Sequence, residues 1–317
     1  MAEALDRVAT AALSLAVQAQ PESGGPAIAI ATDDTAAHVG AICAALTTLG
    51  ARGVPFRLAD CAFDASAPHG LCIPGFADAP PAAVFVRALA GGSFEAVTKR
   101  LGILHALGAL GVPVINSAKA MENCVDKAMT SFLLARAGIA TPPAWALETR
   151  AAAAAVAARE LAFGPLVLKP LFGSQGRGLR LIHSVDDLPE VEAVNGVYYL
   201  QRFVGVSGPQ FCDTRLLVWR GRVLAAMTRR SDTWIVNIKQ GGKPSRYDPS
   251  PDMAALAVSA AAATGAEFAG VDIIIGDNGP QVIEVNSTPA WEGLQRVTDF
   301  DIAAAVAGEL VAGAKRA

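Results

Sequence analysis

The chain has 317 residues, of which 52% are hydrophobic and 17% charged, and its net charge is -3. This apolar content excludes intrinsic disorder, and the length predicts more than one core because single cores stop growing at about 250–300 residues. With a pI near 5.8 the chain carries no overall basic charge, which counts against nucleic acid as the main partner. Small molecules are the expected ligands.

The sequence predicts neither a membrane partner nor export. No window of about 18–20 residues is both apolar and free of charge, as a spanning helix requires. The N-terminus carries Glu3, Asp6 and Arg7 instead of a basic run before an apolar block, so no secretory signal is expected. The five cysteines never form a C-x-x-C pair, which favours a reduced, cytoplasmic compartment. A homo-oligomer is compatible with the sequence, which does not set the oligomeric state.

Apolar runs alternate with segments of helical spacing over the first 116 residues. Helices are expected at residues 2–19, 35–49 and 94–110, and strands at 27–31, 54–58, 83–87 and 112–115. This alternation indicates a parallel sheet covered by helices. The turn after the first strand lacks the G-x-G-x-x-G pattern that a dinucleotide-binding fold needs, which argues against NAD.

Beyond residue 116 the pattern changes at a proline-rich linker. A helix over 121–137 ends at Gly138, and Thr141-Pro142-Pro143 marks an extended linker that acts as a hinge between two predicted domains. Further helices are expected at 144–162, 252–264 and from Asp301, and strands at 165–169, 179–183, 197–204, 214–219, 223–229, 270–275 and 281–285.

A glycine loop follows the predicted strand that ends at Lys169. The run from Pro170 to Gly178 contains three glycines, a serine and an arginine. Backbone N–H groups of such a loop can wrap phosphate oxygens, and the lysine adds a point charge. It is no Walker A loop, because no Gly-Lys-Ser/Thr opens a helix. A tight glycine hairpin is the alternative interpretation.

Two consecutive apolar strands carry three oxygen-bearing side chains. The turn Gly276-Asp277-Asn278-Gly279 predicts a hairpin that brings Asp272 close to Glu284 and Asn286. A carboxylate within a core-facing run needs a cation or donors to offset its burial, and Mg²⁺ prefers such oxygen ligands. The alternative is that these residues cap turns or face solvent.

These segments, taken in order, resemble the RimK-like carboxylate–amine ligases of the ATP-grasp superfamily over about residues 112–297. The segments that carry the resemblance are Asn116-Ser117, Asp126-Lys127, Ala137-Gly138-Ile139, Lys169 through Gly178, Gln201-Arg202-Phe203-Val204, Asp213-Thr214-Arg215, Asn237 with Gly241-Gly242, Val271-Asp272 and Glu284 through Pro289. The resemblance implies a fold of mixed α/β and α+β class. It places a parallel α/β substrate-type domain at residues 1–120, a small lobe with a glycine-rich lid at 121–200, and a lobe with the metal site at 201–317.

The resemblance also implies which residues bind ATP and Mg²⁺, with Mn²⁺ as an alternative metal. The expected nucleotide contacts are Lys127, Lys169, Gly173, Ser174, Gln175, Gly176, Gly178, Gln201, Arg202, Phe203, Val204 and Asp213. The expected metal ligands are Asp272, Glu284 and Asn286. The family usually has Glu where this chain has Arg202, which leaves the adenine contact of that side chain open.

Further residues are candidates for catalysis and substrate binding. Arg229, Arg230 and Asn286 are the catalytic candidates, and the choice between the two arginines stays open. Arg87, Arg215, Asn237, Lys239 and Gly241 are the substrate-side candidates.

The implied reaction is ADP-forming. A substrate carboxylate attacks the γ-phosphorus of ATP to give an acyl phosphate, and an amine then displaces phosphate. Residues 84–87, 91–95 and 101–107 look like ligases of tetrahydromethanopterin biosynthesis in one-carbon metabolism, which implies a small carboxylate acceptor and glutamate or a similar amino acid as partners of ATP. Two alternatives stay open: glutamylation of a protein C-terminus, and nucleotide binding without ligase activity.

Overall fold

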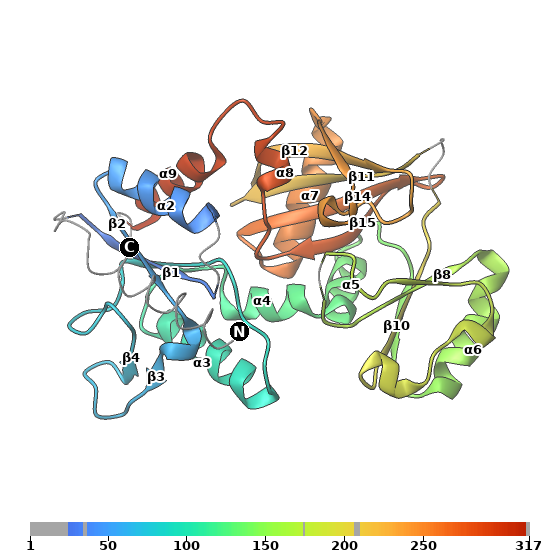
Figure 1. Cartoon of the computed structure of the whole chain (residues 1–317), viewed down its shortest axis with the longest axis horizontal. Helices are drawn as coiled ribbons and strands as arrows, with labels where there is room; N and C mark the ends of the chain where they lie inside the picture. Colours follow the sequence, from blue (N-terminus) through green and yellow to red (C-terminus); the bar gives the residue numbers. More distant parts are fainter. Residues whose placement is uncertain (1–24, 34–36, 174, 206–209, 315–317) are drawn as a thin grey trace, which may run out of the picture. The chain divides into compact units, whose positions relative to one another are not determined.

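The computed structural model describes residues 25–33, 37–173, 175–205 and 210–314 (Figure 1). The chain forms two compact units, one of Met1–Lys119 with Phe300–Ala317 and one of Ala120–Asp299. The predicted helix over residues 2–19 lies outside the described residues. The predicted domain limits at residues 120 and 200 stay predictions. The last helix, α9 (Ile302–Ala314), belongs to the first unit, although the sequence analysis grouped it with the last lobe.

The first unit contains the expected parallel sheet. Its strands run in the order β2 (Arg52–Phe56), β1 (Ala27–Ala31), β5 (Ala83–Val86) and β6 (Val114–Ile115). Helix α2 (Ala37–Thr48) packs against α9 on one side, and α3 (Phe94–Ala109) lies on the other (Figure 1). All four residues of β5 are buried, as expected for a strand whose two faces are both covered. The turn η1 (Leu58–Asp60) and the hairpin of β3 (Ala62–Phe63) and β4 (Leu71–Cys72) complete this unit.

A four-stranded antiparallel sheet forms the first part of the second unit. Its order is β7 (Ala144–Leu147), β10 (Tyr198–Arg202), β8 (Leu166–Lys169) and β9 (Arg180–Ile182). Helix α6 (Arg150–Glu160), followed by the turn η2 (Leu161–Phe163), packs Ala153 and Ala157 against Leu168 and Leu200 of this sheet. The short turns η3 (Val185–Asp187) and η4 (Val191–Val194) connect β9 to β10.

The predicted helix over 144–162 is wrong in its first part. Residues 144–147 form β7 and pair with β10, and α6 begins only after Thr149, whose side chain accepts a hydrogen bond from the Ala152 backbone. The alanine-rich sequence favours a helix locally, but pairing with a strand whose residues lie 51 to 57 positions further along the chain determines the structure of residues 144–147.

A five-stranded antiparallel sheet forms the rest of the second unit. Its order is β13 (Lys243–Arg246), β12 (Arg222–Ser231), β11 (Phe211–Trp219), β14 (Phe268–Gly276) and β15 (Gly279–Asn286). Helix α7 (Pro251–Thr264) covers one face with Ala257, Ala260 and Ala261, which pack among side chains such as Leu216 and Val271. The other face is therefore the one that can carry polar groups.

Four short helical segments join these parts. They are α4 (Ala118–Val125), α5 (Lys127–Arg136), η5 (Ile238–Gln240) and α8 (Glu292–Gln295). Within the described residues, no helix is long and apolar enough to cross a membrane.

The end of α7 offers a test of the backbone geometry. Gly265 ends this helix with a φ of +77°, and an added Cβ would meet only Ala120 Cβ at 3.9 Å. Gly265→Ala should therefore lower the free energy of unfolding by about 1 kcal/mol through backbone strain alone. Gly108→Ala, within α3 and with no atom near the added Cβ, should instead raise it by about 0.5–1 kcal/mol. Urea unfolding of both variants measures the two effects, and equal signs would contradict this account.

Candidate functional site

An open cavity with a volume of about 110 Å³ lies in the second unit and is lined by residues of both of its sheets. Its walls combine cationic, anionic and apolar groups with the loop that connects β8 and β9 (residues 170–178, the glycine loop). The lining residues that the sequence analysis had named are Lys127, Lys169, Gly173, Gln175, Gly176, Gln201, Arg202, Phe203, Val204, Asp213, Arg229, Asn237, Asp272 and Glu284. The fold thus brings together residues that are up to 157 positions apart in the chain.

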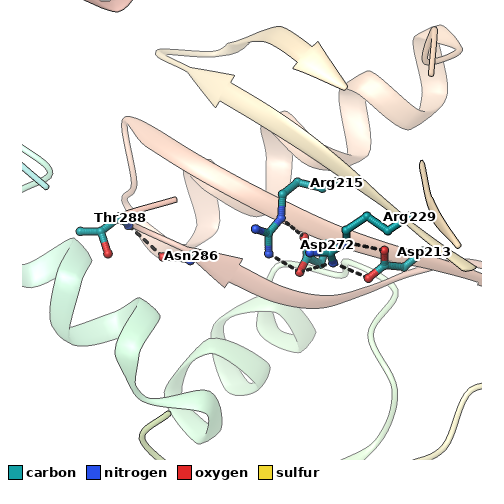
Figure 2. Close-up of polar contacts among 6 residues, drawn as sticks. All are labelled: Asp213, Arg215, Arg229, Asp272, Asn286 and Thr288. Carbon is teal, nitrogen blue, oxygen red and sulfur yellow. Dashed lines mark hydrogen bonds and ion pairs between the residues drawn. The ribbon is translucent and has the colours of Figure 1, made fainter. Parts of the chain in front are cut away.

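The sheet face opposite α7 carries a row of charges that crosses four strands (Figure 2). Arg229 of β12 is paired with Asp213 of β11, and Arg215 of β11 is paired with Asp272 of β14. Asp272 is in turn directly opposite Glu284 of β15. Because directly paired residues, and residues two apart on a strand, share one face, the register alone aligns these side chains.

Two arginines bind the carboxylate of Asp272. Arg215 donates from Nε to Oδ1 and from Nη2 to Oδ2, both at 2.6 Å. Arg229 donates from Nη2 to Asp272 Oδ2 at 2.8 Å and from Nε to Asp213 Oδ1 at 2.7 Å. Burial raises the pKa of Asp272, but the two guanidinium charges outweigh burial and bring this pKa to about 2. Asp272 is therefore ionised throughout the neutral range.

Two lysines line the same cavity as the carboxylates of Asp272 and Glu284. Lys169, at the end of β8, donates to Gln201 Oε1 at 2.6 Å. Burial lowers its pKa to about 8, against the opposing effect of Glu284 and with a further lowering by Lys127. Lys127 opens α5 directly after the N-cap Asp126 and donates to the Gly173 carbonyl at 2.9 Å; burial lowers its pKa as well. Two desolvated ammonium groups favour an anionic ligand.

The glycine loop contacts the segment that precedes β13. Gly176 has a φ of +70°, and a Cβ at this position would come within 2.6 Å of Asn237 Oδ1. Gln240 donates from Nε2 to the Gln175 carbonyl at 3.4 Å. Only glycine satisfies both the conformation and the space at residue 176. Ser174, an expected nucleotide contact, lies outside the described residues.

We call residues 201–204, at the end of β10, the hinge segment, which is distinct from the predicted domain hinge at residues 141–143. Prolines lie beside this segment, immediately before both neighbouring strands. Arg202 N–H donates to the Pro143 carbonyl at 2.9 Å, and Phe203 N–H donates to the Pro165 carbonyl at 3.1 Å. Proline has no N–H, so neither proline can return a hydrogen bond. The positions opposite the carbonyl oxygens of Arg202 and Phe203, immediately before the two neighbouring strands, therefore carry no N–H donor, which suits these oxygens to accept hydrogen bonds from a ligand.

Two of the three expected metal ligands lie together in the cavity wall, and the third does not. Asp272 and Glu284 line the cavity, whereas Asn286 lies further along β15 and its Oδ1 accepts a hydrogen bond from Thr288 N–H at 2.9 Å (Figure 2). In the described part of the chain, no three His, Cys, Asp or Glu side chains gather as a metal site. Three of about four lone-pair positions on the Asp272 carboxylate are used. Two carboxylates, one with a lone pair to spare, fit Mg²⁺, which commonly takes one or two carboxylates and completes its shell with phosphates and water.

The structure separates the two arginine candidates. Arg229 is buried and lines the cavity, whereas Arg230 is exposed on the opposite side of the same strand and donates to Ser245 Oγ. Of the remaining expected site residues, Gly178, Arg215, Lys239, Gly241 and Asn286 belong to the second unit but do not line the cavity, and Arg87 is buried in the first unit.

Much of the apolar lining was missed by the sequence analysis. The missed residues are Val167, Leu179, Trp234, Ile235, Val236, Ile274 and Ile283, whereas Pro170 and Arg177 of the lining belong to the expected glycine loop. Strand alternation could have indicated Ile274, which is two residues from Asp272 and so on the same face. Ile283 could not have been found this way, because a bulge between the pairs Asp272–Glu284 and Ile273–Val282 places two adjacent residues on the cavity side.

Comparisons with known proteins agree with this architecture. Residues 124–310 match the model of the RimK-like ATP-grasp domain. The chain is 38% identical over 198 residues to a tetrahydromethanopterin:alpha-L-glutamate ligase of Methanococcus maripaludis, covering 61% of this chain and 67% of the relative. It is 31% identical over 246 residues to the enzyme of the same name from Methanosarcina acetivorans, covering 67% and 74%.

A solved structure of the ATP-grasp ligase PsnB, in complex with a phosphomimetic variant of its minimal precursor, Mg and ADP, shares the fold. Its TM-score is 0.72 at 20% identity, with 92% of this chain and 99% of that one covered. The fold class and enzyme class expected from the sequence are confirmed: ATP-grasp ligases use ATP with Mg, and this chain is an ATP-dependent ligase that joins a carboxylate to an amine. The matched family model covers more than half of the chain, and the chain therefore belongs to the RimK-like ATP-grasp family.

Proposed function

We propose that this ligase adds L-glutamate to a carboxylate of a tetrahydromethanopterin-type pterin and converts ATP to ADP and phosphate. The observation that carries the proposal is the pairing of two carboxylates, Asp272 and Glu284, with two lysines, Lys127 and Lys169, around one cavity. The names of two relatives at 38% and 31% identity support the choice of glutamate and of the pterin acceptor.

The two lysines and the glycine loop are suited to hold the phosphates of ATP. Their ammonium groups are desolvated, so each interacts more strongly with an anion than it would in water. Bound Mg²⁺, held by Asp272 and Glu284, would supply positive charge that neutralises the phosphate oxygens. The hinge carbonyls of Arg202 and Phe203 suit the amino group of adenine, because both are acceptors.

The buried arginine Arg229 is the proposed catalytic residue of the two candidates. Its guanidinium is held in the cavity wall by Asp213 and Asp272 at the same time. In the proposed reaction, a carboxylate oxygen of the acceptor bonds to the γ-phosphorus while the bond to ADP breaks. The glutamate nitrogen then bonds to the acyl carbon, phosphate leaves, and the amine loses a proton. A fixed cation beside the transferred group stabilises its charge without reorganisation.

Substrate identity is tested by product mass. Incubation of the chain with MgATP, L-glutamate and tetrahydromethanopterin should yield one pterin product heavier by a glutamyl residue, together with ADP and phosphate. Mass spectrometry and nucleotide chromatography detect both. AMP with pyrophosphate would contradict the acyl-phosphate route, and an adduct formed only on a protein C-terminus would favour a protein-modifying ligase.

The metal assignment is tested at Glu284. Glu284→Gln keeps the shape of the side chain but removes its charge, so ATP consumption should fall by about 100-fold or more while the thermal unfolding temperature changes little. Asp277→Asn, in the turn of the same hairpin and outside the cavity lining, serves as the control and should keep normal turnover. Normal turnover in Glu284→Gln would remove this residue from the metal site.

The lowered pKa of Lys169 predicts proton uptake on nucleotide binding. This pKa is about 8 in the free chain against an ordinary 10.5, and phosphate anions favour the charged form and raise it again. Binding of MgADP should therefore take up protons near pH 8, and affinity should fall as pH rises above about 8. Calorimetry in buffers of different ionisation enthalpy measures the uptake. Lys169→Arg, which stays charged, should lose this component, and an unchanged uptake in this variant would contradict the assignment.

A further inference from the structure

Three side chains behind the hinge segment form a cluster that we call the hinge brace: Glu160, Phe163 and Arg202. Arg202, the last residue of β10, donates to Glu160 Oε2 from Nε at 2.8 Å and is ion-paired to the same oxygen through Nη2 at 2.6 Å. Its guanidinium carbon lies 4.5 Å from the centre of the Phe163 ring. Helix α6 and the turn after it therefore bind the hinge strand through one side chain.

The brace lies on the side of the small sheet that faces away from the cavity. Tyr198 and Leu200 of β10 pack into the core beneath α6, and Arg202 follows them at the same two-residue spacing. Gln201, on the other face, lines the cavity and binds Lys169. Glu160 and Phe163 are not among the cavity-lining residues. Arg202 thus lines the cavity, while its guanidinium belongs to the brace.

The nearly buried carboxylate of Glu160 fixes the position of the Arg202 side chain. The Glu160 side chain is only 5% exposed, so its carboxylate needs cationic partners. Two arginines supply them: Arg202, and Arg159, which donates to Oε1 at 2.7 Å and is 60% exposed. Only Arg202 belongs to the hinge, and its bond to a nearly buried carboxylate is screened less by solvent than a surface pair would be.

The brace acts where the hinge backbone lacks two of the hydrogen bonds that a strand ladder would normally supply. The prolines at positions 143 and 165 each accept one hydrogen bond from the hinge and return none. The ladder is therefore weakened on both sides at Arg202 and Phe203, the two residues whose carbonyl oxygens are available to a ligand. A side-chain anchor at residue 202 compensates for the missing backbone bonds.

We propose that Glu160 is a positioning residue for nucleotide binding: through Arg202 it holds the carbonyl oxygens of the hinge segment in place for the nucleotide base. This inference rests on the proposed function, since it takes the cavity ligand to be ATP. Glu160 does not line the cavity. Its effect should therefore appear in nucleotide affinity and not in the chemical step.

The test compares the two arginine partners of the same carboxylate. Glu160→Gln and Arg202→Met should each raise the Kd for MgADP, measured by calorimetry, by about tenfold, because small displacements of a binding group are costly. The double variant should be no weaker than either single variant, since the two changes remove one interaction. Arg159→Met is the matched control and should bind MgADP within about twofold of the unchanged chain. In Glu160→Gln the KM for ATP should rise while kcat at saturating ATP stays within about twofold.

The possible outcomes distinguish a positioning role of Glu160 from a purely structural one. They also distinguish failure of the positioning role from failure of the proposed function. A lowered unfolding temperature in Glu160→Gln with an unchanged Kd for MgADP would overturn the positioning role, as would an equal loss of affinity in Arg159→Met. A lack of MgADP binding by the unchanged chain would instead overturn the proposed function, and this inference with it.

Discussion

The buried charges on the cavity face of the five-stranded sheet constrain the rest of the site. Arg229 and Asp272 are 2% and 1% exposed, and an unpaired charge at such positions costs several kcal/mol. Arg215, Arg229, Asp213 and Asp272 are each bound to an oppositely charged neighbour on the next strand, so none of these four can be removed alone without leaving a buried charge. The same pairing fixes the orientation of Asp272 before any ligand arrives, since two guanidinium groups hold its carboxylate from two directions.

The local charge explains which ligand the cavity can accept. Arg215, Arg229, Asp213 and Asp272 cancel one another, which leaves Glu284 facing two lysines. The lysines alone would attract phosphates, whereas Glu284 would repel them. A divalent cation resolves this conflict because it binds the carboxylate and the phosphates together. The arrangement therefore favours a metal–nucleotide complex over the free nucleotide.

Contacts between residues close together in the sequence could be predicted, whereas contacts between distant residues could not. The Asp272–Glu284 pair was accessible because a four-residue glycine turn joins its two strands. The arginine partners of Asp272 were not, since Arg215 and Arg229 are 57 and 43 residues away and no local pattern specifies which strands become neighbours. The same limit explains why residues 144–147 were expected to be helical: their pairing with β10 is also non-local. The ordered motifs identified the family because they do not depend on knowing these pairings.

The hinge shows how a side chain can depart from the family pattern while the site keeps its chemistry. From the sequence alone the role of Arg202 stays open, because the family usually has an acidic residue there. In the structure its side chain is bound to Glu160 on the far side of the sheet, and the acceptors near the cavity are backbone carbonyls. Pro143 and Pro165 create those acceptors by failing to donate. In the proposed function, base recognition therefore depends on two prolines and on the Glu160–Arg202 ion pair, and the identity of residue 202 matters through the strand that it anchors.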